Sequence, residues 1–307
     1  MTRNLKQAAV RQHPNTSPFA LDDDEAYRAW RAQKLHVYPT DARALVVPVA
    51  NPRAPTMAER VAMRTVCRKT NMVFYASPPE AADDAAIVRG LGAAFGLRDL
   101  DRNLLADDDG VSTLEVMPEK AGRGYIPYSD KRLLWHTDGY YNPPERRIRA
   151  FLLHCVRPAA EGGENRLLDH EIAYIQLRDA DPEFIHALMH PEAMTIPANT
   201  DDETARRAAQ PGQVYAVDST TGRLHMRYTA RARSVLWRDD SATRAAVAFL
   251  AQLLAGESPY VFRHRSAAGA GLLCNNVLHN RTAFVDRPGA AGRRVYRARY
   301  YNRIDDT

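Results

Sequence analysis

Short apolar or alternating runs, separated by turn-forming clusters, dominate the sequence after about residue 96. The runs are VSTLEV, RLLWHTD, RAFLLHCV, ENRLLDH, QVYAVD, RLHMRYT, YVFRHR, GLLCNNVLH and RRVYRARYY. The clusters between them include NPPE, EGGE, STTG, AAGAG and DRPGAAG. Closely spaced short strands with such turns are typical of antiparallel sandwiches and barrels. The pattern therefore predicts a double-sheet β core over the last two thirds of the chain.

Helical patterns flank and interrupt this core. Three aspartates at 22–24 open a helical pattern, where they favour the positive end of the helix dipole. Further helices are expected at 57–69 and 81–95, and strands in ALVVPV and NMVFYAS. Residues 171–190 and the run DSATRAAVAFLAQLLAG give two more helical patterns. We predict an α+β fold, with a polar segment and helix over 1–40, one domain over 41–307 and a helical insertion near 171–190.

The composition suits a globular core and does not favour a nucleic-acid partner. Hydrophobic residues make up 45% and charged residues 26% of the 307 residues, an ordinary globular balance. The net charge is +5, but only five of the 42 basic residues are lysines, and the arginines are interleaved with acids. Because nucleic-acid surfaces cluster their basic residues, we expect no nucleic-acid partner.

The cysteines and the apolar runs indicate a cytoplasmic protein. There are three cysteines without a CxxC pair, and Cys155 and Cys274 lie in apolar runs typical of buried, reduced thiols. The N-terminal stretch lacks the apolar core of a secretory signal. No run approaches the length of a membrane span, so no membrane partner is expected. The sequence leaves open whether the chain forms a homo-oligomer.

The segment LLWHTDGYYNPPE contains the strongest candidate metal ligands. His136 and Asp138 are two residues apart at the end of an expected strand, so their side chains share a face. His279, at the end of the strand LLCNNVLH, is the best third ligand. Two histidines and one carboxylate on one face suit Fe(II) oxygen chemistry. An HxD pair alone is weak, because without further context a strand-end histidine with an ordinary hydrogen bond explains it better.

A second signal follows in HNRTAFVDRPGAAGRRVYRARYY. Arg293 and Arg297 are four residues apart and share a face if the segment is a strand. A guanidinium in that position can bind a carboxylate with two hydrogen bonds. The alternative is that some of these arginines, Arg293, Arg294, Arg297 or Arg299, form a solvent-facing strand surface.

The ordered set of HTD, PP, GGE, HNRTAF and a closing arginine strand resembles the superfamily of taurine dioxygenase, clavaminate synthase and γ-butyrobetaine hydroxylase. The resemblance covers about residues 133–301, and 44–132 less specifically. It implies a double-stranded β-helix, or jelly roll, as the core of the domain over 41–307. It also implies an Fe(II)-dependent, TauD/TfdA-like dioxygenase, an oxidoreductase that consumes O2 and 2-oxoglutarate and releases succinate and CO2. The default reaction is hydroxylation of a small organic substrate.

The same resemblance implies roles for individual residues. His136, Asp138 and His279 would bind the iron. Arg293 would pair with the distal carboxylate of 2-oxoglutarate, and Arg294 is the rival in the neighbouring register.

Other implied contacts concern the cosubstrate and the substrate. Asn165 stands where relatives place a threonine that contacts the same carboxylate of 2-oxoglutarate, and an amide can donate that hydrogen bond. Arg297 occupies the place where some relatives contact an anionic substrate group. We therefore expect an anionic or amino-acid-like substrate. Tyr140, Tyr141 and His225 are further candidates to line its pocket.

Two other functions remain possible from the residues alone. A zinc hydrolase could use the same triad, but it would not need Arg293 or the closing arginine strand. A non-catalytic jelly-roll binding protein would not need the intact triad. Other motifs are weaker evidence for a function. The segment HEIAY, for example, lacks the second histidine of a zinc protease motif. We expect His186 and His190 to lie on an ordinary helix face, His154 to be a core histidine, and Asp169 and Asp218 to be cap or turn residues.

Overall fold

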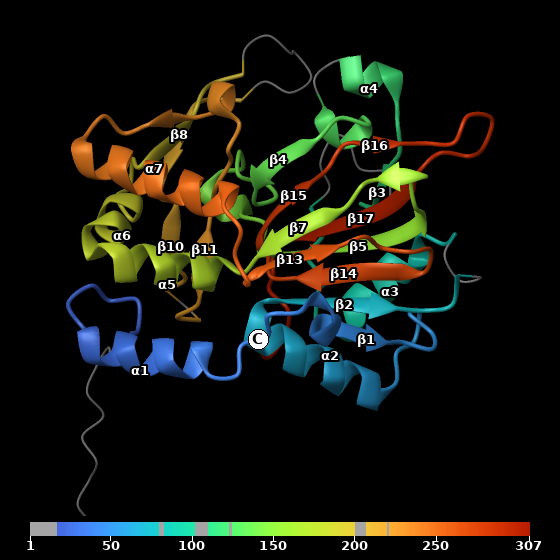
Figure 1. Cartoon of the computed structure of the whole chain (residues 1–307), viewed down its shortest axis with the longest axis horizontal. Helices are drawn as coiled ribbons and strands as arrows, with labels where there is room; N and C mark the ends of the chain where they lie inside the picture. The colour runs from blue at the N-terminus through green and yellow to red at the C-terminus, as the bar shows by residue number, and fades with distance from the viewer. Residues whose placement is uncertain (1–16, 80–82, 102–109, 123–124, 200–206, 220) are drawn as a thin grey trace, which may run out of the picture.

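The computed structural model describes residues 17–79, 83–101, 110–122, 125–199, 207–219 and 221–307, and its fold is mixed α+β (Figure 1). Two larger sheets form its centre. One has six strands in the order β1-β2-β14-β5-β17-β3, and the other has four in the order β13-β7-β15-β4. The six are Val46–Pro48, Met72–Ala76, Ala270–Cys274, Ala150–Arg157, Arg294–Tyr300 and Ser112–Leu114. The four are Val261–His264, Asn165–Leu168, Leu278–Arg281 and Leu133–His136.

The two sheets share one apolar core. Phe151 of β5 contacts His279 of β15 with ring centroids 4.7 Å apart, and Phe74 of β2 stacks on His264 of β13 at 4.0 Å. Leu272 of the six-stranded sheet and Leu278 of the four-stranded sheet lie in the same buried cluster. The inner faces therefore pack against each other, and His279 projects between them.

Two helices cover the outer face of the six-stranded sheet. They are α2, Met57–Thr70, and α3, Ala86–Ala94 (Figure 1). Met63 and Cys67 of α2 pack with Leu91 of α3 and with sheet residues in a second buried cluster. A capping box between Thr56 and Glu59 starts α2. The predicted helix over 57–69 is confirmed, and α3 begins later than the predicted 81; residues 81–82 lie outside the described part.

The predicted helical region after residue 170 consists of two helices. They are α5, His170–Ala180, and α6, Pro182–Leu188, which meet at Asp181, the N-cap of α6. A third helix, α7, Ser241–Ala255, packs on both. Asp169 caps α5 and the side chain of Asp218 accepts from the backbone of Thr221, so both predicted cap or turn roles are confirmed.

Small strands complete the region beside these helices. β10 and β11, Tyr215–Val217 and Leu224–Met226, form a hairpin. β12, β8 and β9 form a three-stranded sheet: Leu236–Trp237, Met194–Ile196 and Gln210–Gly212. β6, Glu161–Gly162, pairs with β16, Phe284–Val285, and the short helix α4 spans Pro118–Gly122.

The N-terminal helix α1, Asp24–Leu35, lies beside α5 and is tied to it by charge (Figure 1). Lys34, 6% exposed, lies 2.7 Å from Asp169 and 2.5 Å from Glu171. Burial alone would raise the pKa of Glu171, but Lys34 outweighs it and lowers that pKa to about 2. Because a buried charge is stable only when paired, this contact fixes α1 to the core.

The run GLLCNNVLH is divided between two strands rather than forming one. β14 ends at Cys274, and β15 begins at Leu278 in the other sheet. Asn276 between them has φ +50°, a left-handed conformation that asparagine tolerates better than most residues. His279 is therefore the second residue of a new strand, not the end of a long one.

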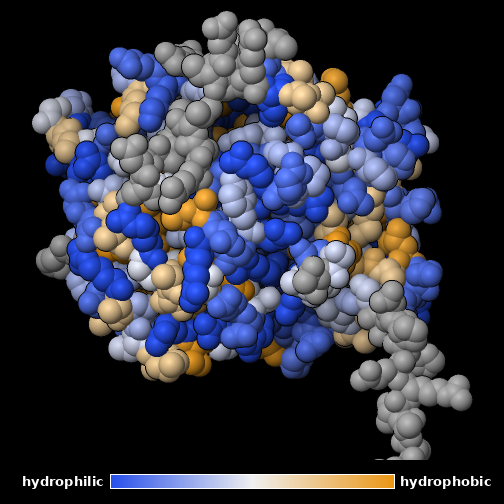
Figure 2. All heavy atoms as spheres, turned by 180° about the vertical axis from the view of Figure 1, so that it is seen from behind, coloured by the Kyte–Doolittle hydropathy of each residue, from blue (hydrophilic) through white to orange (hydrophobic). Residues whose placement is uncertain are grey.

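The surface seen from behind is mostly hydrophilic, with small separated hydrophobic areas (Figure 2). Within the described ranges, no helix is long and apolar enough to cross a membrane.

Candidate metal centre

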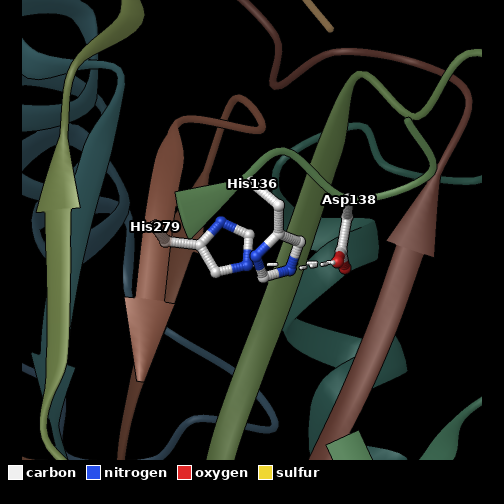
Figure 3. A group of neighbouring side chains, drawn as sticks. All are labelled: His136, Asp138 and His279. Atoms are coloured by element: carbon white, nitrogen blue, oxygen red, sulfur yellow. Dashed lines mark ion pairs between the residues drawn. The ribbon is translucent and has the colours of Figure 1, made fainter. Parts of the chain in front are cut away.

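Three side chains from two distant parts of the chain meet between the sheets (Figure 3). His136 ends β4, Asp138 follows two residues later, and His279 lies on β15. One potential ligand atom from each lies within 4.8 Å of the others, and all three residues are buried. Nε2 of His136 is 3.5 Å from Oδ1 of Asp138, and Nε2 of His279 is 3.9 Å from the same oxygen. The predicted triad is brought together.

Both imidazoles are oriented by the backbone. Nδ1 of His136 lies 2.8 Å from the carbonyl oxygen of Leu134, and Nδ1 of His279 lies 3.0 Å from that of Val277. In each ring Nδ1 therefore donates a hydrogen, and Nε2 is the nitrogen that lies toward Asp138 and could bind a metal. The β4–β15 ladder pairs His136 directly with His279, which sets the two rings 4.1 Å apart.

Asp138 is held by a residue that the sequence patterns did not indicate. β4 ends at His136, so Asp138 lies beyond the strand, and strand alternation does not explain its direction. Instead, Asn276 accepts a hydrogen bond from the Asp138 backbone N–H at 2.8 Å and donates to its carbonyl oxygen at 3.0 Å. Asn276 also donates to the carbonyl of Ile148 at 2.6 Å. The only signal for this role is the polar NN pair inside an apolar run.

The charges of the group suit a divalent cation. Burial would raise the pKa of Asp138, but Arg297 and a hydrogen bond with His136 outweigh it, and the pKa lies well below its ordinary value. Burial and the nearby His136 lower the pKa of His279 to about 3. A carboxylate and a neutral imidazole are the protonation states that bind metal. Among the described residues, Oδ2 of Asp138 is buried without a hydrogen-bond partner, as expected of an oxygen that binds a metal ion.

A small pocket, lined by residues of β5, β7 and β17 and of the GG motif, contains a buried arginine. Arg293, 8% exposed, lines it together with Gly163, Asn165 and Cys155. Burial lowers the pKa of Arg293. Among the residues that the structure describes, no carboxylate lies within ion-pair distance of its guanidinium, so the pocket presents an unneutralised cation.

The GG and HNRTAF motifs build the walls of this pocket. Gly162 has φ +69°, and a Cβ there would lie 2.1 Å from the carbonyl oxygen of Ala283. Phe284 lies against two guanidinium groups, those of Arg281 at 4.8 Å and Arg293 at 5.2 Å. Arg281 donates to two backbone carbonyls in the loop before β4. Close backbone contact and a stacked phenyl ring thus hold Arg293 in place.

The strand β17 separates the four arginines of the closing motif. Arg294 forms an ion pair with Glu115 at 3.0 Å and lies away from the pocket that Arg293 lines. Arg297 reaches Asp138, with NH1 3.6 Å from Oδ2, and its Nε is buried without a hydrogen-bond partner. Arg299 pairs with the buried Asp101. Of the four arginines, Arg297 is thus the one whose carboxylate neighbour, Asp138, is a candidate metal ligand.

Tyr140 and Tyr141 lie beside the metal group, whereas the structure does not bring His225 into it. The Tyr140 ring is 6.5 Å from that of His136 and 5.3 Å from that of Tyr141. His225 lies on β11, paired with Ala216. Burial and then the charge of the nearby Arg147 hold the pKa of His225 well below its ordinary value.

His154 and His186 lie as expected from the sequence, whereas His190 is not on a helix face, because α6 ends at Leu188. Nδ1 of the buried His154 lies 2.7 Å from the hydroxyl oxygen of Tyr75. His186 is exposed on α6 and lies 3.7 Å from Glu183. The three cysteines are buried and unpaired.

Comparisons with known proteins agree with this geometry. The family described as Taurine catabolism dioxygenase TauD, TfdA family matches residues 63–299. A uridine-5'-phosphate dioxygenase from Amycolatopsis sp is 32% identical over 178 residues, 54% of this chain and 60% of that protein. Another from Streptomyces sp is 31% identical over 140 residues, 44% of this chain and 47% of that protein. The chain thus spans less than two thirds of the length of either relative.

Solved structures share the fold at low sequence identity. A mutant of the non-heme iron oxygenase OrfP, in complex with (3S)-hydroxy-L-Arg, has a TM-score of 0.60 and 15% identity over 80% of each chain. Asparagine oxygenase in complex with Fe(II), hydroxyasparagine and succinate has a TM-score of 0.56 and 16% identity over 82% of this chain and 85% of that chain. Because the family match covers most of the chain, the protein belongs to the taurine catabolism dioxygenase TauD, TfdA family.

Proposed function

We propose that this protein is an Fe(II)- and 2-oxoglutarate-dependent dioxygenase, in which His136, Asp138 and His279 hold the iron and Arg293 binds the distal carboxylate of 2-oxoglutarate. The observation that carries the proposal is the meeting of three ligand atoms with both histidine Nδ1 atoms at backbone carbonyls. This leaves one lone pair on each ring and one carboxylate for the metal, the facial arrangement of non-haem oxygenases. Bound iron, with 2-oxoglutarate, would supply the oxidising power.

The protein's own side chains would orient 2-oxoglutarate and neutralise its distal carboxylate. Arg293 offers a buried cation without an acid, and Asn165 adds an amide at the same pocket. Arg294 is already paired with Glu115, which favours Arg293 as the cosubstrate ligand. We also propose that the two facing sheets are the halves of a jelly roll within a single domain over 41–307.

We propose that the substrate is a small molecule with an anionic group, bound by Arg297. Arg297 lies next to Asp138 and keeps a buried N–H without an acceptor. Both curated relatives are named uridine-5'-phosphate dioxygenases, which makes a nucleoside 5'-phosphate the first candidate. An amino-acid-like substrate is the second, but the amino-acid oxygenases share only 14–16% identity, which supports the fold alone.

The test is substrate-stimulated succinate release. Protein loaded anaerobically with Fe(II) and 2-oxoglutarate is mixed with O2 and one of uridine 5'-phosphate, other nucleoside 5'-phosphates or free amino acids. We expect uridine 5'-phosphate to raise succinate release and O2 uptake in equal amounts. The result that overturns the nucleotide assignment is a rate that stays at the substrate-free background with every nucleotide.

Matched variants test the residue assignments. Asp138→Ala and His279→Ala should abolish release, while Arg263→Gln, which changes an exposed arginine paired with Glu257, should leave it unchanged. Normal turnover by His279→Ala would refute the metal assignment independently of the substrate.

A further inference from the structure

Arg207 is a partly buried cation whose charge no acid neutralises in the described part of the chain. One nitrogen donates to the carbonyl oxygen of Pro197 at 2.9 Å, and backbone hydrogen bonds pair Arg207 with Asn199. These contacts fix the direction of the guanidinium. Its Nε is buried without a hydrogen-bond partner, and burial lowers its pKa. An N–H in this state is costly unless something binds to it.

Arg207 faces the tyrosines that follow the metal motif. Its guanidinium lies 5.9 Å from the ring centre of Tyr141. Burial lowers the pKa of Arg207, and the nearby Tyr140 and Tyr141 partly offset this by raising it. Ring contacts then lead from Tyr141 to Tyr140 and from Tyr140 to His136. Ring contacts therefore connect Arg207 and Tyr141 to the candidate metal ligand His136.

Tyr141 is itself held rigidly. Its hydroxyl oxygen accepts a hydrogen bond from Arg299 at 3.0 Å, and Arg299 is paired with the buried Asp101. The partly exposed ring of Tyr141 is thus a fixed, flat wall beside the free donor of Arg207. A hydrogen-bond donor beside an aromatic ring is the combination that proteins use to bind unstacked nucleobases.

Neighbouring arginines do not offer the same donor. Arg227 donates from three nitrogens to the backbone carbonyls of Tyr140, Met194 and Gln210. Arg297 lies against Asp138, one of the candidate metal ligands, and is the residue proposed above to bind the substrate anion. The Pro197 carbonyl and the ring of Tyr141 already stabilise the charge of Arg207. Its remaining N–H can therefore be satisfied by a neutral acceptor and does not require an anion.

We infer that Arg207 and Tyr141 form the subsite for a planar, carbonyl-bearing ring of the substrate, of the pyrimidinedione type. Arg207 donates to a ring carbonyl, and Tyr141 packs against the ring. A carbonyl at that position accepts from Arg207, whereas an amino group would place donor against donor. The subsite thereby prefers a uracil-like ring over a cytosine-like one. This inference rests on the proposed function.

The experiment is calorimetric binding to the anaerobic enzyme with Fe(II) and 2-oxoglutarate, without turnover. The three probes are uridine 5'-phosphate, cytidine 5'-phosphate and ribose 5-phosphate, which lacks the ring. We expect Arg207→Met to weaken uridine 5'-phosphate roughly tenfold to a hundredfold, the cost of one charge-assisted hydrogen bond. Its Kd for ribose 5-phosphate should stay within about twofold of wild type, since that probe makes no such bond.

Variants of the ring provide the second measurement. Tyr141→Leu removes the wall and should weaken uridine 5'-phosphate, whereas Tyr141→Phe keeps the ring and should bind it as wild type does. The control Arg263→Met alters an exposed arginine and should change nothing. Thermal unfolding of each variant identifies any loss of fold.

The outcomes are distinguishable. Unchanged binding of uridine 5'-phosphate by both Arg207→Met and Tyr141→Leu overturns the ring subsite and leaves the proposed substrate class intact. Equal weakening of uridine 5'-phosphate and ribose 5-phosphate by Arg207→Met also overturns it, since Arg207 then holds the phosphate. Failure of the wild type to bind any of the three probes overturns the nucleotide assignment and this inference with it.

Discussion

Replacing Arg293 should separate cosubstrate binding from folding. Its guanidinium is 8% exposed and lines the pocket with Gly163 and Asn165, without an acid in the described ranges. Arg294, the next residue, is paired with Glu115 outside that pocket. Arg293→Met removes the proposed carboxylate ligand and fills similar space, and Arg294→Met is its matched control.

The magnitude follows from the contact that is lost. A charge-assisted, two-pronged hydrogen bond to a carboxylate contributes about 3 kcal/mol, so Kd for 2-oxoglutarate should rise about a hundredfold. At a 2-oxoglutarate concentration of about 100 times the wild-type Kd, binding stabilises the wild type by about 2.7 kcal/mol. The variant would gain only about 0.4 kcal/mol at that concentration. For a chain of this size, the difference corresponds to a shift in Tm of roughly 4 °C.

The assay is thermal unfolding of the Fe(II)-loaded protein under anaerobic conditions, with and without 2-oxoglutarate. Without 2-oxoglutarate, Arg293→Met should be at least as stable as wild type, because it removes a buried charge that lacks an acid. With 2-oxoglutarate, the wild type and Arg294→Met should gain several degrees and Arg293→Met almost none. If Arg294→Met loses the gain and Arg293→Met keeps it, the assignment is off by one residue.

Further expectations concern the supports of the site and of the fold. Asn276→Ala removes the brace of Asp138 and should weaken Fe(II) affinity roughly 10- to 100-fold in an anaerobic titration; unchanged affinity would show that the loop holds Asp138 unaided. Lys34→Met leaves two carboxylates buried without their cation and should cost about 3–5 kcal/mol of unfolding free energy in urea, while a cost under about 1 kcal/mol would contradict a buried pair. The pKa of Glu171 is lowered from 4.5 to about 2, so its stabilisation is complete above pH 4.5 and is lost as the pH falls through 2; acid unfolding of wild type should show this loss, and Lys34→Met should flatten it. Gly162→Ala forces a Cβ against the Ala283 carbonyl and should lower Tm and raise the 2-oxoglutarate KM, whereas Gly222→Ala, which has a similar positive φ but no atom within 4 Å of its Cβ, should lower Tm less and leave that KM unchanged.

Sequence periodicity was sufficient for the local elements of the fold. The turn clusters and short alternating runs predicted the β-rich core, the aspartates at 22–24 predicted where α1 begins, and the helical pattern over 57–69 predicted α2. These patterns act over a few residues, so they can be recognised without the tertiary structure. The family match was reachable for the same reason, because HTD, GGE and HNRTAF keep their ligands, glycines and arginines close in sequence.

Tertiary structure decided which of these residues meet and what holds them. Sequence spacing could not separate Arg293 from Arg294, because the choice depends on how β17 enters its sheet, and there Glu115 takes one of them. Nor could it indicate Asn276, whose left-handed backbone carries the chain from one sheet to the other and which braces Asp138 from a distant part of the sequence. The free donor of Arg207 is visible only once the partners of every nearby arginine are known. Local patterns determine the elements and the chemistry they carry, but burial and the pairing of charges arise between distant segments, so only the folded chain determines the site.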